Sequence, residues 1–167
     1  MTTNTAAVSP LEREDAIVKN IKAAFSENIV KEAHTLRRSR VEISTTPENI
    51  VQVASFLRDK LGYDYPDGVS AVDYQREARF EILYHLISTL DRPKRDILLI
   101  VKESVPRNIA KVPSLVSIWP GVENYERECF EMFGITFEGH PKLEKLFLND
   151  NWEGLPPLRK DIRFPTD

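Results

Sequence analysis

The run "RFEILYHLISTLDRPKRDILLIVKE", residues 79–103, is the most informative part of the sequence about the fold. It contains two stretches rich in β-branched and aromatic residues, 79–90 and 96–103, joined by the polar turn "DRPKRD". A third stretch of this kind, "VSAVDY" at 69–74, comes just before them. Such residues favour strands, and connections this short join antiparallel neighbours. The centre of the chain is therefore predicted to form a three-stranded antiparallel sheet.

Helical patterns flank these strands on both sides. The predicted elements outside the three strands are a helix at 9–26, a short strand at 37–45, a helix at 46–62 and a helix at 114–133. Ser9 and Pro10 are placed as N-cap and first helical residue of the first helix, and Gly62 supplies a left-handed end to the second. This order predicts a small α+β domain, with a largely antiparallel sheet and helices packed on one of its faces.

The last part of the chain differs from the rest. Regular patterning fades beyond Gly134, so we expect an α+β domain at residues 1–134 and an extended tail at 135–167. Large apolar residues such as Phe147 and Trp152 alternate there with glycine and proline, and they need a surface to cover them. We interpret the tail as a segment that is laid on a partner and disordered without it. The alternative is that it folds back on its own domain.

Composition excludes several functional classes. The chain has 167 residues, a formal charge of −3 and a pI near 5.7, which argues against a nucleic-acid partner. No apolar run is long enough to span a membrane, and the first fifteen residues do not resemble a secretory signal. Cys129 is the only cysteine, so an internal disulfide and a cysteine-ligated cluster held by this chain alone are both excluded.

The stretch "YERECFEMFGITFEGHP", residues 125–141, concentrates charged groups in a short segment. On a helix, Cys129 falls on the apolar face with Val122, Tyr125, Met132 and Phe133. The residues placed on the opposite, polar face are Glu123, Arg127 and Glu131, and those at its borders are Glu126 and Glu128. The pattern predicts a packed helix that ends at Gly134, with Arg127 sharing its charge with Glu123 and Glu131 or with a carboxylate of a partner.

Three chemical interpretations of this stretch compete with the structural one. Paired carboxylates could perform acid–base catalysis, but no nucleophile or phosphate-binding loop accompanies them. A metal site is disfavoured because the histidines, His34, His85 and His140, are scattered along the chain. Cys129 is expected to be an inert core thiol, and His140 to lie in a capped turn with its imidazole satisfied.

The sequence "YERECFEMFGITFEGHPKLEKLFL", with "VPSLVSIWPGVENY" before it and "DNWEGLPPLRKD" after it, closely resembles the 30-kilodalton subunit of the peripheral arm of respiratory complex I. Related subunits serve deazaflavin- and ferredoxin-dependent dehydrogenases and membrane-bound hydrogenases. The resemblance implies interface or structural roles, and no catalytic, cofactor-binding or metal-binding role, for Glu126, Arg127, Glu128, Glu131, Gly134, Gly139, His140, Pro141, Trp152, Gly154, Arg159, Lys160 and Asp161. Departures from the family pattern are Glu144, the pair Pro156-Pro157 and Ile162.

The resemblance also implies a function. The expected role is a non-catalytic subunit that supports the large, hydrogenase-like subunit near the quinone site, with iron–sulfur clusters in the partner subunits and no cofactor in this chain. The expected location is the cytoplasmic side of the cell membrane, reached only through the complex. Two alternatives stay open: the equivalent subunit of a membrane-bound hydrogenase, and a free-standing enzyme that uses the carboxylates of residues 123–131.

Overall fold

The computed structural model describes residues 11–149 and 151–162. The helices are α1 (Glu12–Ala24), α2 (Ile50–Asp59) and α3 (Glu123–Phe133), and the 3₁₀ turns are η1 (Gln75–Glu77), η2 (Arg92–Lys94) and η3 (Pro120–Val122). The strands are β1 (Val30–Arg37), β2 (Arg40–Thr45), β3 (Tyr65–Tyr74), β4 (Arg79–Ile87), β5 (Leu98–Pro106), β6 (Lys111–Pro113) and β7 (Thr136–Glu138). The protein is an α+β domain, as predicted.

Five strands form one mixed sheet in the order β1-β2-β5-β4-β3. The pairs β3–β4 and β4–β5 are antiparallel, which confirms the prediction made from residues 69–103. β2 lies parallel to β5, and the long connection that parallel neighbours require is supplied by α2 and the β3–β4 hairpin. β1 and the small parallel pair β6–β7 were not predicted; β1 buries few of its side chains and has two irregularities in its register with β2.

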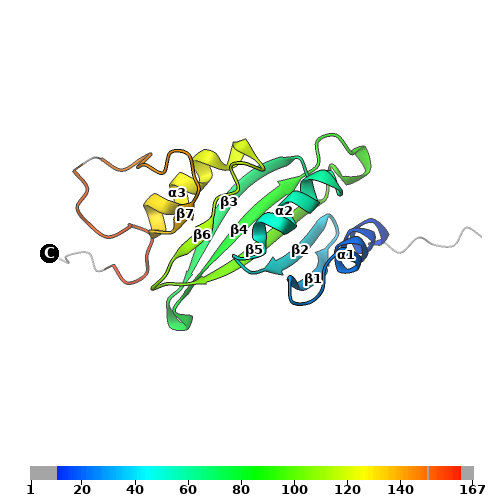
Figure 1. Ribbon diagram of the computed structural model, residues 1–167, viewed down its shortest axis with the longest axis horizontal. Helices are drawn as coiled ribbons and strands as arrows, with labels where there is room; N and C mark the ends of the chain where they lie inside the picture. Colours follow the sequence, from blue (N-terminus) through cyan, green and yellow to red (C-terminus); the bar gives the residue numbers. More distant parts are fainter. Residues whose placement is uncertain (1–10, 150, 163–167) are drawn as a thin grey trace, which may run out of the picture.

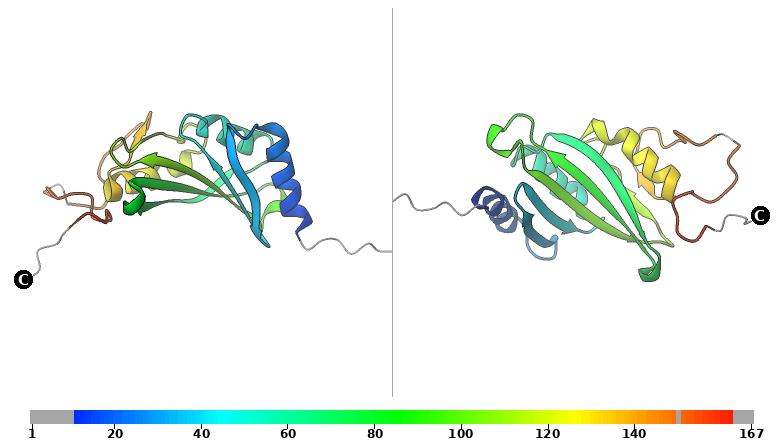
Figure 2. Two further views of the ribbon diagram at one scale, coloured as in Figure 1. Left: turned by 90° about the horizontal axis from the view of Figure 1, so that it is seen from below. Right: turned by 180° about the vertical axis from the view of Figure 1, so that it is seen from behind.

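The core lies on one face of this sheet. Along β4, Phe80, Ile82, Tyr84 and Leu86 are fully buried, while the residues between them are partly exposed. Figure 1 shows α1 beside β1, α2 across the middle strands and α3 beside β3. In the views of Figure 2 the strands form a curved layer under α2. The alternation along β4 therefore follows from a sheet covered on a single face.

The helix boundaries agree with the sequence in part. The proposed N-cap residues Ser9 and Pro10 lie outside the described residues, while Gly62 has the predicted left-handed backbone, with φ of 75°. The third helix is shorter than the predicted 114–133. Residues 115–119 form only a turn, in which the Ile118 and Trp119 N–H groups donate to the Leu115 carbonyl oxygen. Pro120 disfavours helical backbone at Trp119, whose indole donates to the Tyr63 carbonyl oxygen at 3.0 Å.

The chain continues along the domain after α3. Ile135 and Phe137 are buried in the core, and β7 pairs with β6 through Val112 and Phe137. Beyond Glu138 the described residues contain turns but no helix or strand. None of the helices in the described part of the chain has the length and apolar composition that crossing a membrane requires.

Candidate functional site

The site is built from residues 140–149 and 151–161, which we call the C-terminal loop, and from α3, which it follows. At the start of the loop, Gly139 takes a left-handed backbone with φ of 84°. His140 then accepts a hydrogen bond at Nδ1 from the Lys142 N–H, so its proton sits on Nε2, which donates to the Glu123 carbonyl oxygen at 3.0 Å. This confirms the capped turn with a satisfied imidazole. Pro141 is exposed in that turn.

Two charged side chains of α3 bind the backbone of the loop. Arg127 donates from Nε to the Glu144 carbonyl oxygen at 3.1 Å and from Nη2 to the Lys145 carbonyl oxygen at 2.9 Å. Four residues later, the Glu131 carboxylate accepts the Phe147 and Leu148 N–H groups, both at 2.8 Å. One row of α3 thus provides a donor group and an acceptor group that together fix the path of residues 144–148.

These contacts correct two predictions. Arg127 forms no ion pair with Glu123 or Glu131 among the described residues; its third hydrogen bond goes to the Asn124 side chain at 3.2 Å. Glu131, which the pattern places on the polar face, is only 5% exposed because the loop covers it. The helical pattern identified the polar face correctly, but it carried no information about the returning chain that satisfies it. The same contacts show residues 140–148 bound to the domain, where disorder was expected.

The far end of the loop is bound by an ionic cluster of Asp73, Arg107, Arg159 and Asp161. Arg107 contacts Asp73 at 2.9 Å and Asp161 at 2.9 Å, and Arg159 contacts Asp161 at 2.8 Å. Asp73 also accepts the N–H of Lys160 at 2.9 Å, and its side chain is fully buried. The hydrogen bonds from Arg159, and to a smaller extent from Arg107, hold the pKa of the Asp161 carboxyl well below its usual range. Asp161 and the Lys160 backbone therefore bind the domain, and Arg159 pairs with Asp161 within the loop.

Asp73 and Arg107 were missed by sequence reasoning. Lys160 and Asp73 are 87 residues apart in the chain, so no local spacing could indicate the contact. The one available signal was a charged residue, Asp73, at an inward position of a strand whose neighbours Val69 and Phe80 are apolar. Such a residue is expected to have a partner once the strand is buried.

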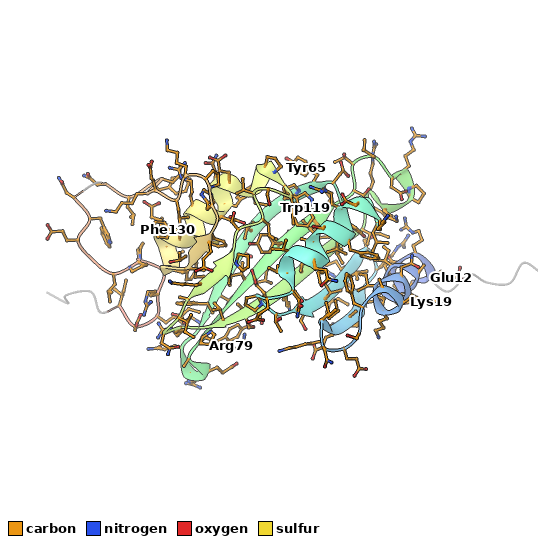
Figure 3. The ribbon with its side chains drawn as sticks, in the orientation of Figure 1. Glu12, Lys19, Tyr65, Arg79, Trp119 and Phe130 are labelled. Carbon is orange, nitrogen blue, oxygen red and sulfur yellow. The ribbon has the colours of Figure 1, made fainter. Side chains whose placement is uncertain are left out.

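Two glycines allow close packing around the middle of the loop, one against α3 and one within the loop itself. Gly134 ends α3 with φ of 76°, and a Cβ there would meet the Pro156 ring at 3.1 Å. A Cβ on Gly154 would meet the Trp152 ring at 3.1 Å. Beneath this crossing lies a hollow of about 200 Å³, lined by Phe130, Glu131, Gly134, Lys145, Leu148, Trp152, Gly154 and Pro156. Figure 3 shows the side chains of Phe130 and of the loop at this end of the molecule.

The loop leaves several large apolar side chains in water although its backbone is bound. Phe147 is 65% exposed, Leu155 56% and Trp152 36%. The ring of Trp152 is oriented by its own N–H, which donates to the Leu155 carbonyl oxygen at 3.2 Å. A preformed loop that presents aromatic and aliphatic groups has the composition of a protein-binding surface.

The other carboxylates of α3 differ sharply from one another. Glu128 is exposed, with no hydrogen bond from the described residues. Glu126 is fully buried and accepts from Ser114 at 2.6 Å, from the Leu115 N–H at 2.8 Å and from Tyr84 at 3.2 Å. Burial raises the pKa of Glu126, and these three hydrogen bonds oppose the rise. Glu126 thus connects α3 to the loop before it, because its carboxylate oxygens accept hydrogen bonds from that loop.

The remaining candidates for chemistry are Cys129 and a metal site. Cys129 is buried on α3, as predicted, and burial raises the pKa of its thiol to about 12. Within residues 11–149 and 151–162, no three His, Cys, Asp or Glu side chains are grouped to hold a metal ion. Glu126 and Glu131 are both engaged by backbone or hydroxyl groups, so these two carboxylates organise the chain around them.

The chain is similar to proteins of respiratory complexes. The family model described as "Respiratory-chain NADH dehydrogenase, 30 Kd subunit" matches residues 43–167. An NADH-quinone oxidoreductase subunit of Roseiflexus sp. (strain RS-1) is 41% identical over 149 residues, covering 87% of this chain and 82% of the relative. The corresponding protein of Roseiflexus castenholzii is 44% identical over 128 residues, covering 75% and 71%.

Two solved structures share the fold. A chain in the structure of the membrane-bound sulfane sulfur reductase, an archaeal respiratory membrane complex, superposes with a TM-score of 0.78 at 28% identity, covering 89% of this chain and 85% of that one. The trypsin-resistant fragment of Nqo5 superposes with a TM-score of 0.62 at 22% identity, covering 78% and 99%. From the family match over residues 43–167 and the identity to curated relatives, this chain belongs to the 30 kDa subunit family of complex I-like respiratory complexes.

Proposed function

We propose that this chain is a non-catalytic subunit of the peripheral arm of a complex I-like membrane oxidoreductase, and that its C-terminal loop binds the large, hydrogenase-like subunit near the quinone site. The observation that carries the proposal is the exposure of Phe147, Trp152 and Leu155 on a loop whose backbone is already fixed by Arg127, Glu131 and the ionic cluster. The names of its relatives support membership in such a complex.

A fixed loop suits this role energetically. Ordering a free chain costs roughly 1–2 kcal/mol per residue, which would consume much of the binding energy of a flexible tail. Here the domain has already ordered the loop, so burial of each large apolar side chain, worth about 1.5–3 kcal/mol, contributes to affinity. We retain as part of the proposal a domain of residues 1–134 and a tail of residues 135–167. Within that tail, the C-terminal loop is the segment that binds the large subunit.

The proposal extends to cofactors and location. Electron transfer would occur through iron–sulfur clusters of neighbouring subunits, and this chain would reach the cytoplasmic face of the membrane only as part of the complex. The purified chain should contain no stoichiometric iron, zinc or flavin by metal analysis and visible spectroscopy. Stoichiometric iron or a flavin absorbance band would contradict this part of the proposal.

The experiment that tests the partner role replaces Phe147, Trp152 and Leu155 by serine and measures how much of the large subunit is recovered with the tagged chain. Because these side chains are exposed, the variant should keep the thermal midpoint of the wild type and lose most of the large subunit. The matched control is Leu90→Ser with Ile109→Ser, two side chains that are 84% and 58% exposed outside the loop. Equal recovery with both variants would refute the role of the loop.

One comparison supplies a second candidate function, a subunit of a membrane complex that reduces sulfane sulfur. The fold match to a chain of the archaeal sulfane sulfur reductase complex covers most of both chains, so the same scaffold serves complexes of different chemistry. The 41% identity to a quinone oxidoreductase subunit exceeds the 28% identity to that archaeal chain, which favours a quinone-reducing complex. Quinone-dependent oxidation of NADH by the purified complex, compared with its sulfane sulfur reductase and hydrogenase activities, separates these alternatives.

A further inference from the structure

The turn between β1 and β2 carries three arginines in four residues: Arg37, Arg38 and Arg40, with Ser39 between them. We call these four residues the arginine turn. Ser39 takes a left-handed backbone with φ of 59°. The turn lies at the end of α1 that contains Glu14, far along the chain from the C-terminal loop.

The arginine turn is held at several points. The Ser39 N–H donates to the buried carboxylate of Glu14 at 2.7 Å, its hydroxyl donates to Asp96 at 3.3 Å, and its carbonyl oxygen accepts the Leu98 N–H at 3.0 Å. Contacts to α1, to the residues before β5 and to β5 itself thus hold Ser39 in a left-handed conformation that glycine adopts more readily. The arginine side chains therefore project from a backbone whose position is fixed.

Their guanidinium groups have no partner among the described residues, whereas most other arginines there do. Arg13 binds Asp96 through two hydrogen bonds of 2.8 Å, and Arg79 and Arg107 each bind carboxylates. For Arg37, Arg38 and Arg40 the described part of the chain shows neither an ion pair nor a side-chain hydrogen bond. Arg37 and Arg38 are exposed and Arg40 is half-buried.

These side chains line a shallow hollow of about 500 Å³ together with Ser39, Asp96 and Leu98. Asp96 is the acidic residue of this lining, and its charge is already matched by Arg13, which helps to lower the pKa of Asp96 to about 2. The hollow is therefore positively charged on a chain whose formal charge is −3. An anionic group entering it would meet several guanidinium donors at once.

We propose that the arginine turn binds an acidic segment, with two or more Asp or Glu side chains, of a neighbouring polypeptide in the complex. Guanidinium groups are weakly hydrated and pair with carboxylates in a bidentate manner, which is why arginine is enriched at protein interfaces. Leu98 in the hollow and Leu36, which is 50% exposed beside the turn, supply apolar contacts that a polypeptide can use. Recognition of anionic lipid by sequence clusters generally involves four to eight basic residues, more than this turn offers.

The inference uses the proposed membership in a multi-subunit complex but not the C-terminal loop. The test places the photo-crosslinking residue benzoylphenylalanine at Leu36 in the tagged full chain, which leaves all three arginines intact, and identifies the products in the purified complex by mass spectrometry. The same residue at Ile109, 58% exposed at the turn after β5, is the control, and at Phe147 it reports on the loop.

The expected product at Leu36 is a crosslink to one partner segment that contains several acidic residues, with no such product at Ile109. A crosslink only to lipid, only to a segment without Asp or Glu, or to nothing would overturn the inference. Crosslinking at Phe147 without crosslinking at Leu36 would overturn it while leaving the proposed function intact. Failure at both positions would contradict both proposals.

A second measurement uses charge. The variant Arg37→Gln, Arg38→Gln, Arg40→Gln should bind the partner that crosslinking identifies about tenfold more weakly than the wild type at low salt, since each exposed pair contributes a modest share. The difference should disappear at high salt, where such pairs are screened. Arg76→Gln, an exposed arginine in η1, is the control. Equal affinity of the triple variant and the wild type for that partner at low salt would overturn the inference.

Discussion

Glu131→Ala is expected to free the C-terminal loop without unfolding the domain. The Glu131 carboxylate accepts the Phe147 and Leu148 N–H groups at 2.8 Å each and is 5% exposed. A hydrogen bond to a charged group contributes roughly 1.5–3 kcal/mol. Because the freed N–H groups can bind water once the loop lifts, we expect the pair to contribute less than the sum, about 2–4 kcal/mol.

This free energy belongs to local opening of the loop. The core residues of α3, such as Cys129 and Phe133, keep their contacts in the variant, so the thermal midpoint of the domain should change little. Glu131 also lies in the last turn of α3, where a negative charge is unfavourable by about 0.3–1 kcal/mol. Removing it slightly stabilises the helix, so a looser loop can be attributed to the lost hydrogen bonds.

The assay is limited trypsin digestion of the isolated chain, with cleavage after Lys145 followed by mass spectrometry. When opening and closing are fast, the cleavage rate follows the population of the open state, so about 2–4 kcal/mol corresponds to roughly 30- to 700-fold faster cleavage. The control is Glu128→Ala, an exposed glutamate on the same helix, which should cleave at the wild-type rate. If Glu131→Ala also cleaves at that rate, these hydrogen bonds do not hold the loop.

Three further predictions concern buried groups. Both carboxyl oxygens of Glu103 are buried without a hydrogen bond among the described residues, and burial followed by the nearby Glu126 raises its pKa well above 4.5, so the folded chain keeps a proton that the unfolded chain loses. The free energy of unfolding should therefore fall by about 1.4 kcal/mol per pH unit as the pH rises from 4.5 toward the folded pKa. Glu103→Leu should remove this slope, measured by urea titrations at about pH 5.5 and 8. An unchanged slope would refute the assignment. Asp73→Asn breaks a buried ion pair with Arg107 and should destabilise the domain by roughly 3–5 kcal/mol in urea unfolding, while Asp59→Asn, in an exposed pair, should leave stability nearly unchanged. Cys129, with its thiol pKa raised to about 12, should not react with a disulfide reagent at about pH 8 until the chain is unfolded in urea; rapid reaction of the native chain would show that α3 is not packed as described.

The elements that could be predicted from sequence are those specified by local patterns. β4 alternates buried and partly exposed residues, and α2 places Ile50, Val53 and Leu57 on one buried face, so both periods are visible in the sequence. β1 lacks such a pattern because it is an edge strand with irregular pairing. The fold class follows from the regular elements and does not depend on β1.

The site was predictable in its residues but not in its contacts. The resemblance selected Arg127, Glu131 and Arg159. Arg127 and Glu131 bind backbone groups 16 to 18 residues further along the chain. The backbone beside Arg159, at Lys160, binds a carboxylate on β3. Helical periodicity describes one helix and cannot show which segment crosses it. For this reason the burial of Glu131 under the loop and the role of Asp73 were not anticipated.

The proposed function requires the exposed side chains of the C-terminal loop to become buried against the large subunit. Hydroxyl-radical footprinting of Phe147 and Trp152, in the isolated chain and in the purified complex, measures this burial at the residues themselves. We expect ready oxidation of Phe147 and partial oxidation of Trp152 in the isolated chain, in line with exposures of 65% and 36%, and strong protection of both in the complex. Oxidation of both residues at the same rate in the complex as in the isolated chain would show that the loop does not bind the large subunit.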